Sequence, residues 1–186
     1  MTALIRTSIS HPIRVDWVRR DIGDGRGRIG CTLAPGKKAS SLFGGSWDRD
    51  LAADLDRLRG ECGVAMLISL IEDHELDLLH IPSLVEDAEG RGISIVRSPI
   101  IDTKTPSLQQ AGRLVQMALE RARAGDAVVF HCRGGLGRAG TLASCCLIEL
   151  GATAQVAIAE VRAARPGSVE NADQEAFVAK FYGARV

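Results

Sequence analysis

Apolar residues occur along the chain both in short continuous runs and in helical repeats. The runs at 64–71, 93–96 and 127–130 are typical of buried strands. Apolar spacing predicts helices at 49–59, 107–124, 139–150, 153–165 and 171–182, with shorter helical segments at 72–79 and 82–88. Strands that alternate with helices predict an α/β fold: a single domain with a central, mostly parallel sheet flanked by helices on both faces.

The N-terminal quarter of the chain lacks this regularity. Residues 1–45 are rich in glycine and turn residues, and we expect an irregular leader that packs on the domain, with short strands near 13–17 and 29–33. Residues 46–186 are expected to form the main domain.

Composition narrows the class of protein. The 186 residues suffice for one ordinary domain with a sizeable core. Lys plus Arg number 23 and Asp plus Glu number 23, which argues against a general polyanion binder but leaves room for one basic pocket. We therefore expect no nucleic-acid partner.

Nothing in the sequence indicates a membrane or a secretory route. There is no apolar run of about 18 residues, and Met1–Ser10 has no apolar segment long enough for a signal peptide. The five cysteines are odd in number, and Cys145 and Cys146 are adjacent in an apolar helix, which is most simply core. The cysteine usage predicts a reduced, cytoplasmic protein. The absence of a long apolar run predicts no membrane partner.

One segment suggests chemistry. An apolar strand at 128–130 runs into a glycine-rich turn that begins at Cys132 and closes at Arg138, and a helix follows. Backbone N–H groups of such a turn converge on an anion, and the helix N-terminus adds the positive end of its dipole. Glycines at 134, 135 and 137 leave the backbone free to turn its N–H groups inward.

These residue types fit phosphoryl transfer. A thiol attacks as thiolate, which a cradle of N–H donors favours. The same cradle can bind the three equatorial oxygens of a phosphoryl group while sulfur attacks in line, and the planar fork of Arg138 can hold two of them.

The pattern His-Cys-x-x-Gly-x-x-Arg at 131–138 resembles the signature loop of the cysteine-dependent protein-tyrosine phosphatases. Gly-Gly-Leu-Gly-Arg at 134–138 is similar to the dual-specificity branch that contains the kinase-associated phosphatase (cyclin-dependent kinase inhibitor type) and its bacterial relatives. The similarity runs from about Gly30 to Phe181 and includes segments at 70–76, 98–102 and 165–169.

The resemblance implies roles for individual residues. Cys132 would be the nucleophile that forms a phosphocysteine, and Asp102 the general acid on a loop. Gln174 would help place the attacking water. Phosphate would be bound by Arg138 and the backbone of Arg133, Gly134, Gly135, Leu136 and Gly137. Neither a metal nor a cofactor is implied.

Two further residues are expected to support the loop. His131 is expected to be a buried, hydrogen-bonded imidazole that orients the loop rather than a catalytic base. The family usually has Ser or Thr directly after the arginine, where the hydroxyl stabilises the departing thiolate. This chain has Ala139 there, with Thr141 two residues later, which predicts slower breakdown of the phosphocysteine.

Plainer interpretations exist beside these. Aspartates in proline-rich loops, such as Asp102, commonly form turns, and a polar residue such as Gln174 is ordinary near a helix start. Glu72-Asp73-His74-Glu75 could suggest a metal site, but we interpret it as a solvated helix N-terminus that could also line the pocket rim.

The resulting expectation is a phosphate monoester hydrolase, a protein-tyrosine or dual-specificity phosphatase whose partner is a phosphorylated protein or peptide. Phosphate, sulfate, vanadate and tungstate are expected to bind the loop as inhibitors. Alternatives are a phosphoinositide, RNA or small-metabolite phosphatase, a catalytically weak phosphoprotein-binding module, and a rhodanese-like sulfur transferase.

Overall fold

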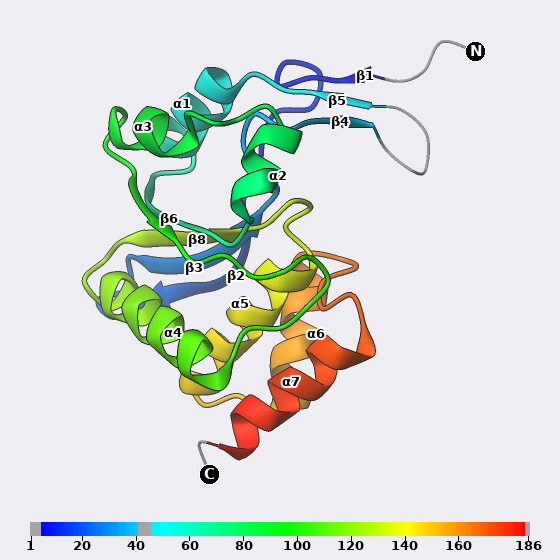
Figure 1. Cartoon of the computed structure of the whole chain (residues 1–186). Coiled ribbons are helices and arrows are strands. Elements are labelled where there is room, and N and C mark those ends of the chain that lie inside the picture. Colours follow the sequence, from blue (N-terminus) through cyan, green and yellow to red (C-terminus); the bar gives the residue numbers. More distant parts are fainter. Residues whose placement is uncertain (1–4, 41–45, 185–186) are drawn as a thin grey trace.

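The computed structural model describes residues 5–40 and 46–184. A five-stranded sheet in the order β2-β3-β8-β6-β7 forms its centre (Figure 1). All neighbours pair in parallel except β2 and β3, which are antiparallel. The strands are β2 Asp16–Ile22, β3 Gly27–Thr32, β6 Val64–Ser69, β7 Ser94–Arg97 and β8 Ala127–His131.

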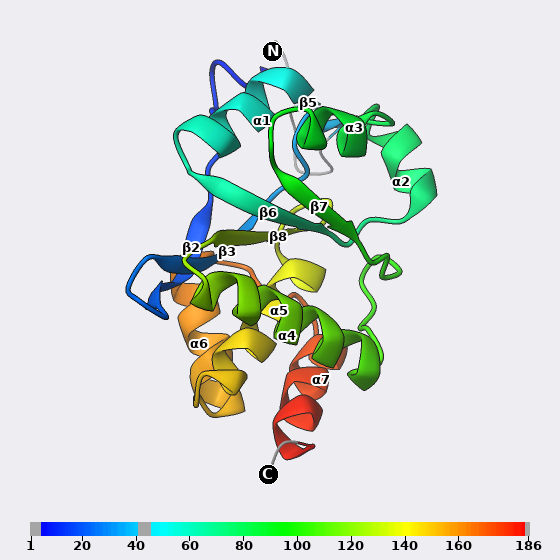
Figure 2. The ribbon, with the colours of Figure 1, turned by 90° about the vertical axis from the view of Figure 1, so that its left-hand side faces the viewer.

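Helices cover both faces of this sheet, as Figures 1 and 2 show from two directions. On one face lie α1 Leu51–Gly60, α2 Asp73–Leu78 and α3 Leu84–Glu89. On the other lie α4 Leu108–Arg123, α5 Gly137–Glu149, α6 Ala154–Ala164 and α7 Ala172–Gly183. Coverage on both faces explains why every residue of β8 is buried.

Local sequence explains where the helices begin. The Ser107 side chain accepts a hydrogen bond from the Gln110 backbone at the start of α4, and Asn171 accepts from Gln174 at the start of α7. Asp50 and Thr153 cap α1 and α6 in the same way. None of the described helices is both long enough and apolar enough to cross a bilayer.

The expected α/β class is confirmed, with one antiparallel edge strand added to a parallel sheet. The short strands expected near 13–17 and 29–33 overlap β2 and β3, but β2 begins later and is longer than expected, and both strands belong to the central sheet rather than to an irregular leader. β2 is an edge strand whose pairing shifts register twice, and β3 contains two glycines, so neither shows a regular alternation. Residues 1–4 and 41–45 of the expected leader lie outside the described residues.

A second, small sheet in the order β1-β5-β4 lies beside the first. Its strands are β1 Ile5–Arg6, β4 Lys38–Ser40 and β5 Ser46–Asp48. Strands of two or three residues are too short to produce a hydrophobic period, so the sequence pattern did not indicate them.

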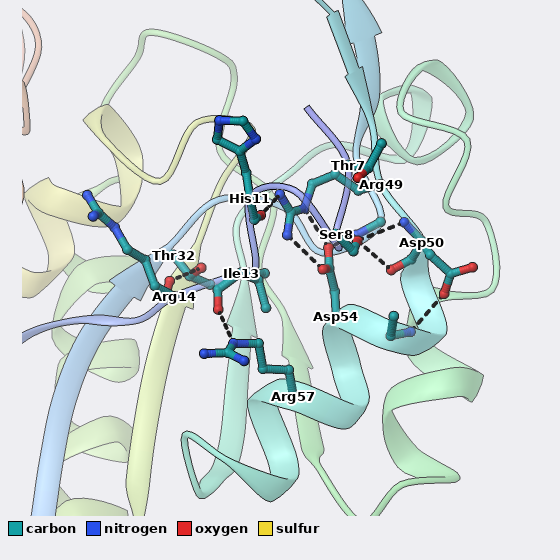
Figure 3. Close-up of polar contacts among 12 residues, drawn as sticks. Thr7, Ser8, His11, Ile13, Arg14, Thr32, Arg49, Asp50, Asp54 and Arg57 are labelled. Atoms are coloured by element: carbon teal, nitrogen blue, oxygen red, sulfur yellow. Dashed lines mark hydrogen bonds and ion pairs between the residues drawn. The ribbon is translucent and has the colours of Figure 1, made fainter. Parts of the chain in front are cut away.

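A buried ion pair attaches the N-terminal segment to the domain (Figure 3). Arg49 and Asp54 are each 1% exposed, and the Arg49 guanidinium donates to both carboxylate oxygens at 2.7 and 2.8 Å. Asp54 also accepts from the Gly36 backbone N–H at 2.9 Å, and Arg49 donates to the His11 carbonyl at 2.7 Å. One pair of charges therefore connects α1 to two separate stretches of the N-terminal segment.

Replacing Asp54 by Ala is expected to destabilise the fold by about 3–5 kcal/mol, because it leaves the Arg49 charge buried without a partner. The free energy of unfolding from urea titration measures this. Asp48→Ala is the matched control, since Asp48 pairs with Lys38 at the surface and such pairs contribute about 0–1 kcal/mol. Equal losses in the two variants would contradict the role assigned to the buried pair.

Candidate active site

The central element of the site is the turn between β8 and α5 (Figure 1). Cys132 follows directly on β8 and is 3% exposed. Gly135 has a φ of +72°, and a Cβ atom there would lie 2.2 Å from the Thr32 carbonyl oxygen. The turn therefore packs against the end of β3 in a conformation that glycine alone adopts without strain.

Arg138 lies in the first turn of α5 and is 1% exposed. Its guanidinium makes a bidentate ion pair with Glu75 of α2, at 2.6 Å from Nη1 to Oε2 and 2.9 Å from Nη2 to Oε1. Nη1 also donates to the Ile100 carbonyl at 2.9 Å. The fork is therefore fixed from two sides.

The pKa values of this pair follow from its geometry. Burial is the largest single influence on each group and favours its neutral form, but the hydrogen bonds and opposite charges around each group together outweigh burial. The pKa of Glu75 is held below its ordinary value, and the pKa of Arg138 is held above its own. Both groups therefore remain charged.

Asp102 reaches the same guanidinium from the loop after β7. Its Oδ1 lies 2.8 Å from Nη2 of Arg138, and its side chain is 49% exposed. The backbone N–H of Asp102 donates to Glu72 at 3.3 Å. A half-exposed carboxyl beside the arginine can exchange its contact for a bound anion's without the fold being disturbed.

Gln174 is fully buried at the start of α7 and meets the loop of Asp102. Its Oε1 accepts from the Glu170 backbone at 2.8 Å, and its Nε2 donates to the Thr103 carbonyl at 3.5 Å. Asn171 donates to the same carbonyl at 2.9 Å. The expected acid loop and the expected water-positioning residue are therefore adjacent.

Glu170 is a site residue that the sequence analysis missed. Its carboxylate accepts a hydrogen bond from the Gly137 backbone N–H and lies near Asp102 and Arg138. Partial burial of the carboxyl group of this otherwise exposed residue, and then the charge of Asp102, raise the pKa of Glu170. A carboxylate thus contacts one of the N–H groups that the sequence assigned to phosphate.

The two supporting residues differ in what they do. Burial lowers the pKa of His131 to about 4, so the imidazole is neutral at pH 7, and its Nδ1 lies 3.4 Å from the Cys132 carbonyl oxygen. The Thr141 hydroxyl donates to the Gly137 carbonyl at 2.8 Å, one helical turn back. That hydroxyl is occupied within α5, so its bond does not replace the one missing at Ala139.

Cations outside the signature also surround the turn. Arg165 donates to the Gly134 carbonyl at 2.7 Å and pairs with Asp16. The pKa of Lys37 is lowered, first by burial and then by the charge of Arg133. The sequence analysis singled out neither Arg165 nor Lys37 as a site residue.

Glu75 is the largest omission. The sequence analysis interpreted residues 72–75 as a solvated helix N-terminus, which is wrong for Glu75, since it is 2% exposed. A signal existed, because a buried arginine requires a carboxylate and this segment follows a core strand. Glu75 lies within the segment 70–76 that is similar to the family, but this similarity did not indicate which carboxylate pairs with the arginine.

Together these groups form a site for an anion. The Cys132 thiol lies at the start of the turn. The N-terminus of α5 at the end of the turn and the Arg138 side chain both contribute positive charge, and the Asp102 carboxyl contacts Arg138. This arrangement can hold a tetrahedral oxyanion against the sulfur and provide a proton donor on its exposed side.

The sequence is similar to those of known proteins. Residues 39–178 match the family described as "Swiss Army Knife protein, DSP-PTPase phosphatase domain" (PTP-SAK). Cyclin-dependent kinase inhibitor 3 of Homo sapiens is 25% identical over 142 residues, which cover 76% of this chain and 64% of that protein. The protein of the same name from Rattus norvegicus is 24% identical over 173 residues, 91% of this chain and 79% of the relative.

Solved structures share the fold. The kinase associated phosphatase with its catalytic site cysteine substituted by serine superposes with a TM-score of 0.81 at 22% identity, covering 92% of this chain and 95% of that one. Tk-PTP in the active form gives a TM-score of 0.72 at 28% identity, covering 92% and 97%. Because the family match spans about three quarters of the chain, the protein belongs to this DSP-PTPase phosphatase family.

Proposed function

We propose that this protein hydrolyses phosphate monoesters through a phosphocysteine intermediate, with phosphorylated tyrosine, serine or threonine side chains of proteins as its substrates. The observation that supports this most directly is the Arg138 guanidinium, held by Glu75 at the turn that starts with Cys132 and contacted by Asp102. An anion site, a thiol and a carboxyl meet there, and the family match adds the chemistry of a phosphatase.

In the first step the phosphate enters the turn and takes hydrogen bonds from its backbone N–H groups and from Arg138. The Cys132 thiolate attacks phosphorus in line, the S–P bond forms and the ester P–O bond breaks. Asp102 gives its proton to the departing oxygen, so the leaving group is an alcohol or phenol rather than an alkoxide or phenolate. The positive charge of the turn stabilises the negative charge on the equatorial oxygens.

In the second step a water replaces the product alcohol. Asp102, now a carboxylate, accepts a proton from that water while the oxygen of the water attacks phosphorus. Gln174 orients the water by hydrogen bonding. The S–P bond breaks, the electron pair returns to sulfur, and inorganic phosphate leaves. The closeness of Gln174 to the Asp102 loop supports this pairing of roles.

Substrate must displace the protein's own carboxylates. Asp102 contacts Arg138, and Glu170 contacts the Gly137 N–H, so both occupy groups that the mechanism assigns to phosphate. Phosphate has more acceptor oxygens than a carboxylate and more charge, which favours the exchange. Asp102 then faces the leaving group instead of the arginine.

Hydrolysis of p-nitrophenyl phosphate is expected to persist in the presence of a chelator, because the turn and Arg138 supply the positive charge. Cys132→Ser should abolish turnover, since a hydroxyl is a poor nucleophile here, and Arg138→Lys should lower kcat/KM by about 100- to 1,000-fold. Cys62→Ser is the matched control and should retain turnover. Native protein that binds tungstate without turnover would indicate a phosphate-binding module instead.

Replacing Asp102 by Asn should affect substrates according to their leaving groups. Loss of kcat/KM is expected to be about 100-fold or more for phenyl phosphate, which needs protonation, and less than about tenfold for p-nitrophenyl phosphate. Asp77 is an exposed carboxylate on α2, and the control Asp77→Asn should leave kcat/KM unchanged for both substrates. An equal loss of kcat/KM for both substrates in Asp102→Asn would contradict the assignment of Asp102 as the general acid.

Ala139→Ser should speed breakdown of the phosphocysteine by about three- to tenfold, the effect of one added hydrogen bond to the departing sulfur. Rapid-mixing kinetics should show less accumulated phosphoenzyme and a higher kcat. Ala143 is also buried on α5, one turn further along. Ala143→Ser adds a hydroxyl there and should change neither the accumulated phosphoenzyme nor kcat. An unchanged breakdown rate in Ala139→Ser, with hydrolysis limiting, would refute the explanation.

A further inference from the structure

A large cavity opens beside the catalytic turn, and the proposed hydrolysis does not use it. Its volume is about 700 Å³, and Gly134 and Leu136 of the turn form part of its wall. This volume lies in the range of cavities that hold a ligand of small-molecule size, so it exceeds what one phosphate in the turn requires. Most of the other lining residues come from the N-terminal segment, and Trp47 of β5 also lines the cavity.

The lining of this cavity is strongly positive. No carboxylate occurs among the described residues that line it. The cations are Arg6, Arg14, Lys37, Arg49 and Arg165.

Three of these cations have partners outside the cavity. Arg49 is neutralised by Asp54, while Arg165 and Arg14 both approach Asp16. Within the part of the chain that the structure describes, neither Lys37 nor Arg6 pairs with a carboxylate. Each lies over the Trp47 ring instead, at 5.6 and 5.3 Å from its centroid. A ring face stabilises a cation without neutralising its charge.

Lys37 connects the cavity electrostatically to the catalytic turn. Its side chain is half-buried, and burial together with the charge of Arg133 makes the ammonium form less favourable. The charges of Cys132 and Asp102 act on it in the opposite sense, so Lys37 is near enough to both to interact with them. An anion in the cavity would relieve the repulsion among these cations.

The wall of the cavity is held in place by the fold. Arg49 donates to the His11 carbonyl at 2.7 Å, and Arg57 donates to the Ile13 carbonyl at 2.9 Å (Figure 3). The Thr32 hydroxyl donates to the Arg14 carbonyl at 2.8 Å. The cavity is therefore pre-formed, which lowers the entropic cost of binding there.

We propose that this cavity binds a second phosphate group of the substrate, so that the protein prefers doubly phosphorylated substrates to singly phosphorylated ones. The proposal rests on the proposed function, because the first phosphate is the one that the turn receives. Two unpaired cations match the charge of a phosphate dianion, and the guanidinium of Arg6 suits its oxygens. The second phosphate could belong to a second phosphorylated side chain of a peptide or to a small polyol phosphate.

The test compares kcat/KM for pairs of substrates that differ by one phosphate. One arm uses a phosphotyrosine peptide with serine or phosphoserine at successive positions on either side, and the other uses inositol monophosphates and bisphosphates. In the native protein the ratio of doubly to singly phosphorylated substrate should reach about tenfold in at least one pair, which corresponds to about 1.4 kcal/mol. The arm in which the ratio rises identifies the source of the phosphate.

The ratio should fall toward one in Lys37→Met, which keeps an unbranched apolar side chain beside Trp47, and in Arg6→Ala. Lys180→Ala, which removes a lysine from the surface of α7, should keep the native ratio. A native ratio near one for every pair, or a ratio that Lys37→Met and Arg6→Ala leave unchanged, would overturn the proposal.

Failure of the proposed function would give a different result. Native protein that hydrolyses neither p-nitrophenyl phosphate nor any member of the panels is not a phosphatase under these conditions. The cavity is then tested by calorimetric titration of the Cys132→Ser protein with the same pairs. Tighter binding of a doubly phosphorylated member that Lys37→Met abolishes would support the second site, and equal affinities would overturn it.

Discussion

A single buried ion pair, between Arg138 and Glu75, determines the geometry of the active site. The two side chains are 1% and 2% exposed and come from helices on opposite faces of the sheet. A buried guanidinium without a partner is costly, so α2 must present its carboxylate where α5 presents its arginine. The same guanidinium donates to the Ile100 carbonyl, two residues before Asp102. One guanidinium thus contacts both Glu75 and the start of the loop that contains Asp102.

The positive charge that this arrangement concentrates attracts carboxylates from within the chain as well as from a substrate. Three reach it, and they differ in how readily they can leave. Glu75 is buried and bidentate, whereas Asp102 is half-exposed and Glu170 is exposed. Glu75 is therefore a permanent part of the site, and the other two can yield to phosphate. Because the pKa of Glu170 is raised, its ionised form is less favourable at this position than in water.

The parts of the fold and site that the sequence predicted are those with local signals. The turn at 131–138, the α5 helix and strands β6 and β8 each have a pattern confined to a few neighbouring residues. Glu75 pairs with a residue 63 positions away, and no local pattern records such a pairing. Strand β2 was expected too early and too short, at 13–17, because its shifted register hides the alternation that an ideal edge strand would show. Sequence reasoning therefore placed Cys132 and Arg138 in one turn but did not identify the carboxylate that orients the arginine.

The N-terminal segment is a structural part of the domain, and this changes how its residues are interpreted. Strands β2 and β3 belong to the central sheet, and Arg49 attaches the preceding residues to α1 through Asp54. The equal numbers of acidic and basic residues in the whole chain conceal an uneven distribution, since the cavity beside the turn is lined by cations alone among the charged groups described. Cys132, Asp102 and Arg138, to which the proposed chemistry is assigned, come from the second half of the chain, whereas four of the five cations that line the cavity come from its first 49 residues. Residues about a hundred positions before the signature thus line the same cavity as Gly134 and Leu136, and the proposed preference for a second phosphate depends on them.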